Sequence, residues 1–139
     1  MRRYLPVLLA GALVFAVSAA QAVDDRHVNV ALDVTLNSAP GSNVSGRVNL
    51  TSLPRGGTVV TVVARGLDPG EEYVSLYYEN HTCELEPYDE DDVIGRFTAN
   101  AAGVGTVKRT VGENLVDINS VSIRLNETLT LQACANVHP

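Results

Sequence analysis

The residues of this chain that could do metal or redox chemistry are its three histidines. His27 lies in the N-terminal part, His81 directly precedes the segment of Cys83, and His138 is the penultimate residue. Imidazole nitrogens are preferred ligands of copper and zinc. Because all three histidines are in terminal or loop positions, we expect them to be solvated surface residues rather than metal ligands. His27 and His138 could meet and bind a stray metal if the first and last strands are neighbours.

The densest charge cluster is acidic, and carboxylates offer a second kind of chemistry. Carboxylate oxygens bind hard cations such as Ca²⁺, so one interpretation is a cation site. The spacing does not fit an EF-hand, because the invariant glycine is missing and Pro87 interrupts the run. The other interpretation is a solvated acidic loop. The cluster consists of Glu84, Glu86, Asp89, Glu90, Asp91 and Asp92.

Catalytic motifs give no further candidate. The sequence contains no G-x-S-x-G motif, and no serine and histidine are placed as a pair. In so acidic a chain no two carboxylates stand out as an acid and base pair. We therefore predict no catalytic residue, no metal ligand and no cofactor.

The N-terminus has the three parts of a secretory signal peptide. Two arginines open the sequence, an uncharged apolar run covers residues 5–17, and Ala20-Gln21-Ala22 supplies small residues for cleavage. The run is shorter than the roughly 20 apolar residues of a membrane span. We predict a cleaved signal peptide over residues 1–22 and a secreted product, extracellular or periplasmic. The mature chain, residues 23–139, is predicted to be one domain without a transmembrane segment.

Export bears on the two cysteines and on possible partners. An even count in an oxidising compartment predicts one disulfide, between Cys83 and Cys134, the alternative being two free thiols. The formal net charge is −6 and no basic patch is present. Because such a surface repels phosphates, nucleic acid is not expected as a partner. Sequons for glycosylation begin at Asn43, Asn49, Asn80 and Asn126, and they matter only in a host with that machinery.

The elements that must position all these residues are β-strands. Short segments rich in Val and Thr alternate between apolar and polar residues and are separated by turn signals such as Asp68-Pro69-Gly70. Eight of them predict an all-β antiparallel sandwich or barrel with a core of Val, Leu and Ile. The third is apolar enough for burial on both faces. The segments are 28–34, 44–50, 58–64, 73–78, 93–99, 104–111, 121–125 and 129–137.

Several motifs along these strands resemble the copper/zinc superoxide dismutases. Gly66-Leu67-Asp68-Pro69-Gly70, then a strand and Cys83, is similar to the turn that leads into the family's copper-binding strand. Further similar stretches are Val44–Val48, Gly95–Asn100 with Gly103-Val104, and Leu131–Cys134. The resemblance covers most of the mature chain, roughly residues 28–137. It implies an eight-stranded Greek-key β-barrel.

The metal ligands of that family do not carry over. Ser75 and Tyr77 stand where the resemblance places two copper-binding histidines. Arg124 stands at about the position of another, and a guanidinium cannot ligate a metal. The family's bridging and zinc-binding histidines lie after the first cysteine, where this chain has none before Val93. Leu131 replaces the family's anion-guiding arginine.

The resemblance also implies which side chains of the fourth strand face outward. We expect Val74 and Leu76 to face the core and the alternate residues to face solvent. Together with Arg124 they would form an open surface suited to a protein or glycan ligand. We thus predict a non-catalytic exported module for binding or structure. The alternatives are a divergent copper/zinc superoxide dismutase, which is an enzyme, and a metal-handling protein using the acidic loop. The candidate binding surface consists of Tyr73, Ser75, Tyr77 and Arg124.

Overall fold

The computed structural model describes residues 29–139. The predicted signal peptide, residues 1–22, lies outside the described residues, as does His27. No helix within the described range is long and apolar enough to cross a membrane.

Eight strands and one short 3₁₀ helix make up the described chain, and all eight predicted strand segments are confirmed. The first strand begins later than predicted and runs four residues further, to Ser38, because its alternation continues to buried Leu36. The elements are β1 (Ala31–Ser38), β2 (Ser45–Ser52), β3 (Thr58–Arg65), β4 (Glu72–Tyr78), β5 (Val93–Thr98), β6 (Gly105–Val111), η1 (Leu115–Asp117), β7 (Ser120–Leu125) and β8 (Leu131–Asn136).

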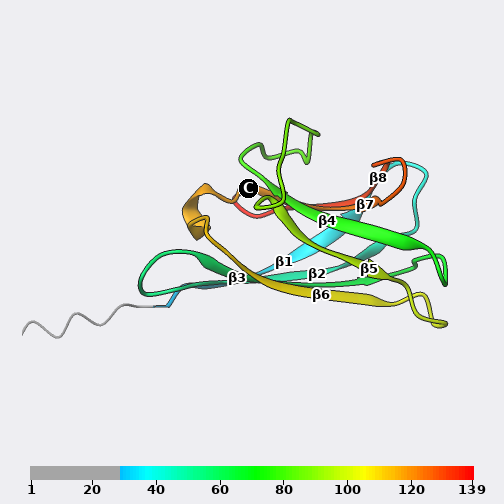
Figure 1. Ribbon diagram of the computed structural model, residues 1–139, viewed down its shortest axis with the longest axis horizontal. Coiled ribbons are helices and arrows are strands. Elements are labelled where there is room, and N and C mark those ends of the chain that lie inside the picture. The colour runs from blue at the N-terminus through cyan, green and yellow to red at the C-terminus, as the bar shows by residue number, and fades with distance from the viewer. Residues whose placement is uncertain (1–28) are drawn as a thin grey trace, which may run out of the picture.

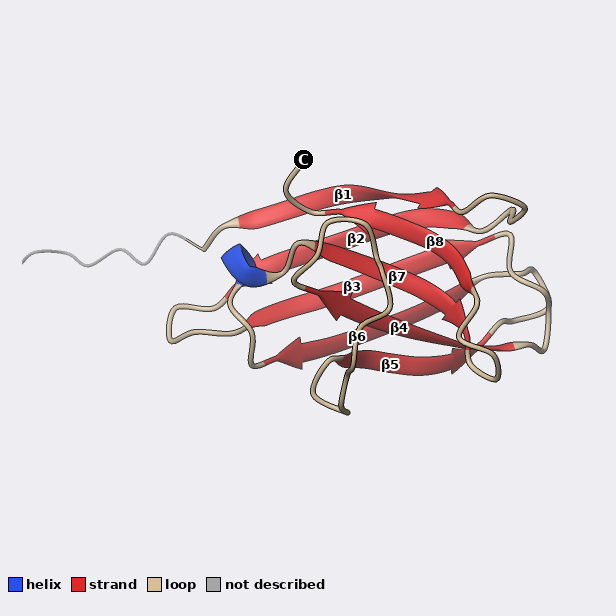
Figure 2. Ribbon diagram, turned by 90° about the horizontal axis from the view of Figure 1, so that it is seen from above, coloured by secondary structure: helices blue, strands red, loops and turns tan. Residues whose placement is uncertain are grey.

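The strands form one antiparallel sheet that curls into a nearly closed barrel (Figures 1 and 2). Their order is β5-β4-β7-β8-β1-β2-β3-β6, so β5 and β6 are the two edges. Read across the seam, the order β7-β4-β5-β6 is that of a Greek key. The predicted all-β fold, with eight antiparallel strands in a barrel, is confirmed.

Side chains rather than a strand ladder seal the seam between β5 and β6. Gly105 on β6 lies so close to the ring of Phe97 that a side chain there would overlap it, and Gly95 on β5 is covered in the same way by Val107. Arg109 on β6 donates a hydrogen bond to the carbonyl oxygen of Val93 on β5. The barrel is therefore closed by contacts that need glycines at two facing positions.

The barrel interior is packed mainly with Val, Leu and Ile, as predicted. Tyr73 is the largest fully buried side chain and stacks on Phe97 with 5.9 Å between ring centroids. Inward residues of the other strands contribute fully buried aliphatic side chains. They include Leu36, Val48, Leu50, Val60, Val62, Ile94, Val121 and Ile123.

The prediction that the third strand is buried on both faces is wrong. In β3 the inward residues are buried, but the alternate residues, such as Val59 and Val63, are only half-buried. A single barrel wall has no second layer to cover its outside. As in β7, both faces are buried in β4, where every residue after Glu72 is buried. The connection over residues 79–92 and the start of β8 lie over its outer face.

The predicted disulfide between Cys83 and Cys134 is confirmed. It joins the connection after β4 to β8, with 5.9 Å between the two Cα atoms. The backbone N–H of Cys83 also bonds to the Ser120 hydroxyl at 3.2 Å. The 79–92 connection is thereby fastened at Cys83 to the strands beneath it.

Candidate functional site

The predicted outward face of β4 is in fact its inward face. Tyr73 and Tyr77 belong to the barrel core, and Ser75 between them is 0% exposed. Ser75 lies opposite Ile123 of the same core, and its hydroxyl donates to the carbonyl oxygen of Ser122 at 2.9 Å. Because both alternating sets of this strand are rich in large side chains, alternation alone does not tell the inside from the outside.

Arg124 does not join these residues on an open surface, contrary to the prediction. It lies directly opposite Val74 across the β4–β7 ladder and therefore points to the other face of the sheet. Its side chain is 6% exposed. The guanidinium donates to the carbonyl oxygens of Leu129 and Cys83 and to the Tyr78 hydroxyl, at 2.7, 2.5 and 2.9 Å. The candidate surface is thus buried and split between two faces.

The outer face of β4 carries an apolar cluster beneath the 79–92 connection. Its buried members are Val74, Leu76, Tyr78, Cys83 and Val93. No residue of this cluster is a histidine or a carboxylate. These side chains, with Ser75, Tyr77 and Arg124, do not fit a copper or zinc ion, which needs several nitrogen, sulfur or carboxylate donors around one point. No metal step is derived from this region.

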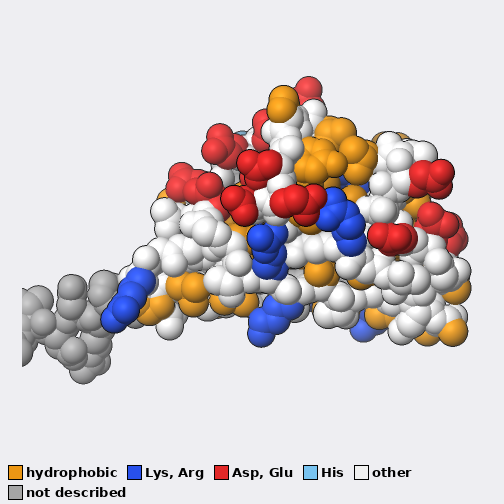
Figure 3. Space-filling model, in the orientation of Figure 1, with side chains coloured by type: hydrophobic (Ala, Val, Ile, Leu, Met, Phe, Trp, Pro, Cys, Tyr) orange, Lys and Arg blue, Asp and Glu red, His pale blue; other side chains and the backbone are white. Residues whose placement is uncertain are grey.

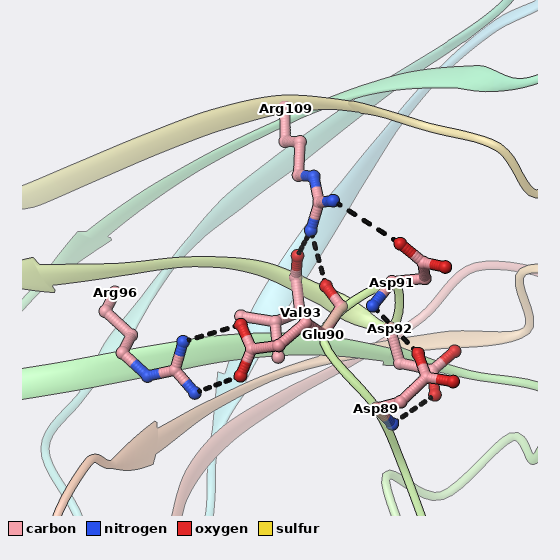
Figure 4. A network of polar contacts seen from close by, with 7 residues as sticks. All are labelled: Asp89, Glu90, Asp91, Asp92, Val93, Arg96 and Arg109. Carbon is pink, nitrogen blue, oxygen red and sulfur yellow. Dashed lines mark hydrogen bonds and ion pairs between the residues drawn. The ribbon is translucent and has the colours of Figure 1, made fainter.

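The acidic connection is ordered by its own hydrogen bonds and by two arginines (Figure 4). Asp89 accepts the backbone N–H of Asp91 at 2.8 Å, and Asp92 accepts that of Asp89 at 3.0 Å. Glu90 forms a two-pronged pair with Arg96, at 3.0 and 2.9 Å, and this hydrogen bonding lowers the pKa of Glu90.

The described residues bring no three His, Cys, Asp or Glu side chains close enough to hold a metal ion. His81 is exposed and lies 3.3 Å from the Asn136 side chain. His138 is half-buried rather than fully solvated, and its ring bonds to the Leu115 carbonyl oxygen at 2.9 Å. The two described histidines therefore form no metal site with the acidic side chains of the 79–92 connection, to which His81 itself belongs.

A pocket of about 410 Å³ opens where β4 ends. Three elements of one end of the barrel form its walls: the end of β4, the 79–92 connection, and the chain just after β6. Its volume lies within the usual range for small-ligand sites. The lining combines aromatic and acidic side chains, and it consists of Tyr77, Tyr78, Glu79, Glu86, Pro87, Tyr88, Asp92 and Glu113.

Hydrogen bonds to backbone carbonyl oxygens hold the three walls in place. The Tyr77 N–H donates to the Asp92 carbonyl oxygen at 3.1 Å, which joins the two ends of the connection. The Asn119 side chain donates to the carbonyl oxygen of Glu79 at 2.6 Å. On the opposite wall, the Thr58 hydroxyl donates to the carbonyl oxygen of Glu113 at 2.8 Å. The walls of the pocket are therefore fixed by hydrogen bonds to the rest of the fold.

The hydroxyl of Tyr77 is a polar group of this pocket that has no hydrogen-bond partner among the described residues. Tyr77 is 7% exposed, and no described residue hydrogen-bonds its hydroxyl. Every fully buried side-chain nitrogen or oxygen among residues 29–139 does have a partner. The Tyr77 oxygen must therefore touch open space, and the open space that this residue lines is the pocket.

No protein-family model matches this chain, and no curated protein sequence matches it. The pocket takes its chemistry from its acidic and aromatic lining. None of its four carboxylates forms an ion pair with another described residue, whereas Asp33, Glu90 and Asp91 each do. Burial raises the pKa of Tyr77 to about 12, and the charges of Asp92, Glu113 and Asp91 add to this, against the opposing charge of Arg109.

Sequence reasoning found only part of this pocket. Glu86 and Asp92 were in the predicted acidic cluster, and Tyr77 was in the predicted surface for a different reason. Tyr78, Glu79 and Tyr88 flank that cluster, and an aromatic-acidic run could have marked them. Glu113 gave no sequence signal, because only the folding of the chain after β6 across the barrel end brings it to the pocket.

A second hollow of about 330 Å³ lies beside η1 and is mostly apolar. Its walls include Val30, Leu32, Leu53 and Val116, and Val116 is 74% exposed. No cluster of polar groups converges on it. Nothing in the described residues shows what covers it.

Proposed function

We propose that this chain is an exported, non-catalytic binding module on a barrel of the copper/zinc superoxide dismutase type. The order and spacing of the motifs around Asp68-Pro69-Gly70, Cys83 and Cys134 support the kinship. A relationship to the copper/zinc superoxide dismutases implies an eight-stranded antiparallel barrel, and this chain forms such a barrel with the Cys83–Cys134 disulfide. A shared fold does not carry a shared activity, which depends on the residues of the site.

The observation that carries the proposal is the use of the three copper-ligand positions for packing. Ser75 and Tyr77 are turned into the barrel, and Arg124 is committed to two carbonyl oxygens and a hydroxyl beneath the 79–92 connection. Superoxide dismutation by copper needs a metal ion held by imidazoles with an open coordination position. Rebuilding such a site would require moving strands that the core holds in register. The structure therefore supports ligand binding at the barrel end better than it supports copper catalysis.

The decisive assay measures superoxide consumption by the disulfide-bonded protein after refolding with excess copper and zinc. We expect turnover no higher than that of the same copper free in solution. Turnover well above that level, surviving replacement of His27, His81 and His138 by Ala, would contradict the proposal and return the dismutase alternative. Turnover lost in those variants would also contradict it, by placing a new copper site at the histidines.

Export is tested separately, on the N-terminus. Expression in a host with a secretory pathway should give a product that begins at Val23, because cleavage is predicted after Ala22. N-terminal sequencing or intact mass of the exported protein checks this. A product that retains residues 1–22 and stays in the cytoplasm would contradict the exported part of the proposal.

A further inference from the structure

We propose that the pocket at the end of β4 binds the cationic head of an organic cation, an ammonium or guanidinium group on an alkyl chain. The inference rests on the proposed function and names the ligand class of that module. The lining of the pocket combines tyrosine rings with the carboxylates of Glu79, Glu86, Asp92 and Glu113. Aromatic faces and carboxylates together are the usual protein surroundings of such cations.

The charge of the pocket is the first argument. Four carboxylates converge on it without a described cationic partner, while the nearby arginines are already committed elsewhere. Arg96 is bound to Glu90, and Arg109 donates to the carbonyl oxygens of Glu90 and Val93 and lies 3.8 Å from Asp91. In the view of Figure 3, acidic side chains gather over the upper part of the molecule, on the side of the 79–92 connection. A cation entering here meets a negative potential.

The Tyr77 hydroxyl is the second, independent argument. It belongs to a side chain more than nine-tenths buried, it has no described hydrogen-bond partner, and it lines the pocket. A buried phenol normally finds a partner for its hydroxyl. Its oxygen can accept a hydrogen bond from an ammonium or guanidinium N–H. The Tyr77 side chain thus offers the pocket a hydroxyl acceptor that no described residue occupies.

The spacing of the carboxylates decides between an organic cation and a bare metal ion. Ca²⁺ needs six to eight oxygens at roughly 2.3–2.6 Å from one point. The described carboxylates do not converge so closely. They line a space of about 410 Å³, which has room for an alkylammonium or alkylguanidinium head among them. The rings of Tyr77 and Tyr88 suit the carbon-rich surface of such a ligand, which a hydrated metal ion lacks.

The test is a titration of the disulfide-bonded protein followed by ¹H–¹⁵N NMR at constant ionic strength. The probes are butylammonium and methylguanidinium, with butanol as the uncharged control. We expect saturable shifts at Tyr77, Glu79, Asp92 and Glu113, with a dissociation constant on the order of 1 mM for so small a ligand. Butanol should give none. Absence of saturable shifts, or equal shifts with butanol, would overturn the inference.

Matched variants separate the pocket from general surface charge. Glu79→Gln with Glu113→Gln should weaken butylammonium binding by about 5-fold, because two of the pocket's negative charges are lost. Glu71→Gln with Glu127→Gln removes the same charge away from the pocket and should leave the affinity unchanged. Tyr77→Phe keeps the ring and should weaken binding by about 2-fold through the lost acceptor. Equal weakening by both double variants would overturn the inference.

Further ligands distinguish the possible sources of the cation and test whether the pocket binds a metal ion instead. Spermidine and the peptide acetyl-Gly-Lys-Gly-amide present the same ammonium head as a free amine and as a protein side chain. Tighter binding of either supports the pocket and indicates the source. Ca²⁺ that saturates the same shifts at lower concentration than butylammonium would overturn the inference in favour of a metal site. A protein without superoxide turnover that binds no probe would refute only this inference, while turnover would refute the proposed function.

Discussion

Arg124 lies opposite Val74 in the β4–β7 ladder, and its guanidinium is buried under the 79–92 connection without a described carboxylate partner. Carbonyl oxygens, the Tyr78 hydroxyl and the Tyr78 ring, 5.9 Å away, surround the charge instead. The Tyr78 hydroxyl, which accepts from Arg124, is also hydrogen-bonded to the Ser122 hydroxyl at 2.7 Å. One side chain thus joins β4, β7, the Cys83 segment and the turn before β8.

Replacing Arg124 should therefore destabilise the fold strongly. Arg124→Met keeps much of the volume but leaves the carbonyl oxygens of Cys83 and Leu129 without their donor, at an expected cost of about 3 kcal/mol in the free energy of unfolding. The control is Arg47→Met, which removes an exposed pair with Asp33 and should lower the free energy of unfolding far less. Urea unfolding measures both. Equal losses would mean that the buried guanidinium is not a structural anchor.

Gly46 on β2 should not tolerate a side chain. A Cβ atom there would overlap the backbone carbonyl oxygen of Val63 on the neighbouring strand, and backbone cannot swing aside. Gly46→Ala is expected to cost about 2–3 kcal/mol in unfolding free energy. Gly112→Ala is the matched control, since it has open space and an ordinary backbone angle, and it should change stability by less than about 0.5 kcal/mol. A stable Gly46→Ala protein in thermal or urea unfolding would show that β2 and β3 can separate locally.

Tyr77 should make stability depend on pH in the alkaline range. Its pKa is raised to about 12 in the folded state, against about 10 in an unfolded chain. The raised value means that folding favours the protonated phenol, so the contribution is complete below about pH 10 and is lost as the pH rises toward 12. Urea unfolding at about pH 9 and about pH 11 should show a smaller loss for Tyr77→Phe than for the unchanged protein. The same loss in both proteins would assign the effect to other groups.

The disulfide should contribute a large share of the stability. Cys83 and Cys134 are 51 residues apart, for which the chain-entropy account gives about 4 kcal/mol. Replacing both cysteines by Ser should lower the unfolding free energy by about that amount. Adding a reductant should destabilise the unchanged protein similarly and leave the variant unaffected. A variant within about 1 kcal/mol of the unchanged protein would show that the hydrogen bonds at Cys83 hold the connection without the covalent bond.

Much of the fold could be predicted because its signals are local. Alternation of apolar residues set off the strands, and turn residues such as Asp68-Pro69-Gly70 marked where they end. The two cysteines allowed only one intrachain pair. Each of these features depends on neighbours in the sequence or on a count, so the order of the residues was enough.

The inside of β4 and the site at its end were decided by tertiary structure. Tyr73, Ser75 and Tyr77 alternate with Val74, Leu76 and Tyr78, and either set could have faced the core. The barrel closes around Tyr73 and Tyr77, so their set faces the core. The 79–92 connection buries the other set against Cys83 and Val93. Closure of the barrel also forms the pocket. Tyr77, Asp92 and Glu113 meet only when the end of β4, the start of β5 and the end of β6 lie side by side. Long-range burial has no local sequence signature, since its free energy depends on which surfaces finally cover one another.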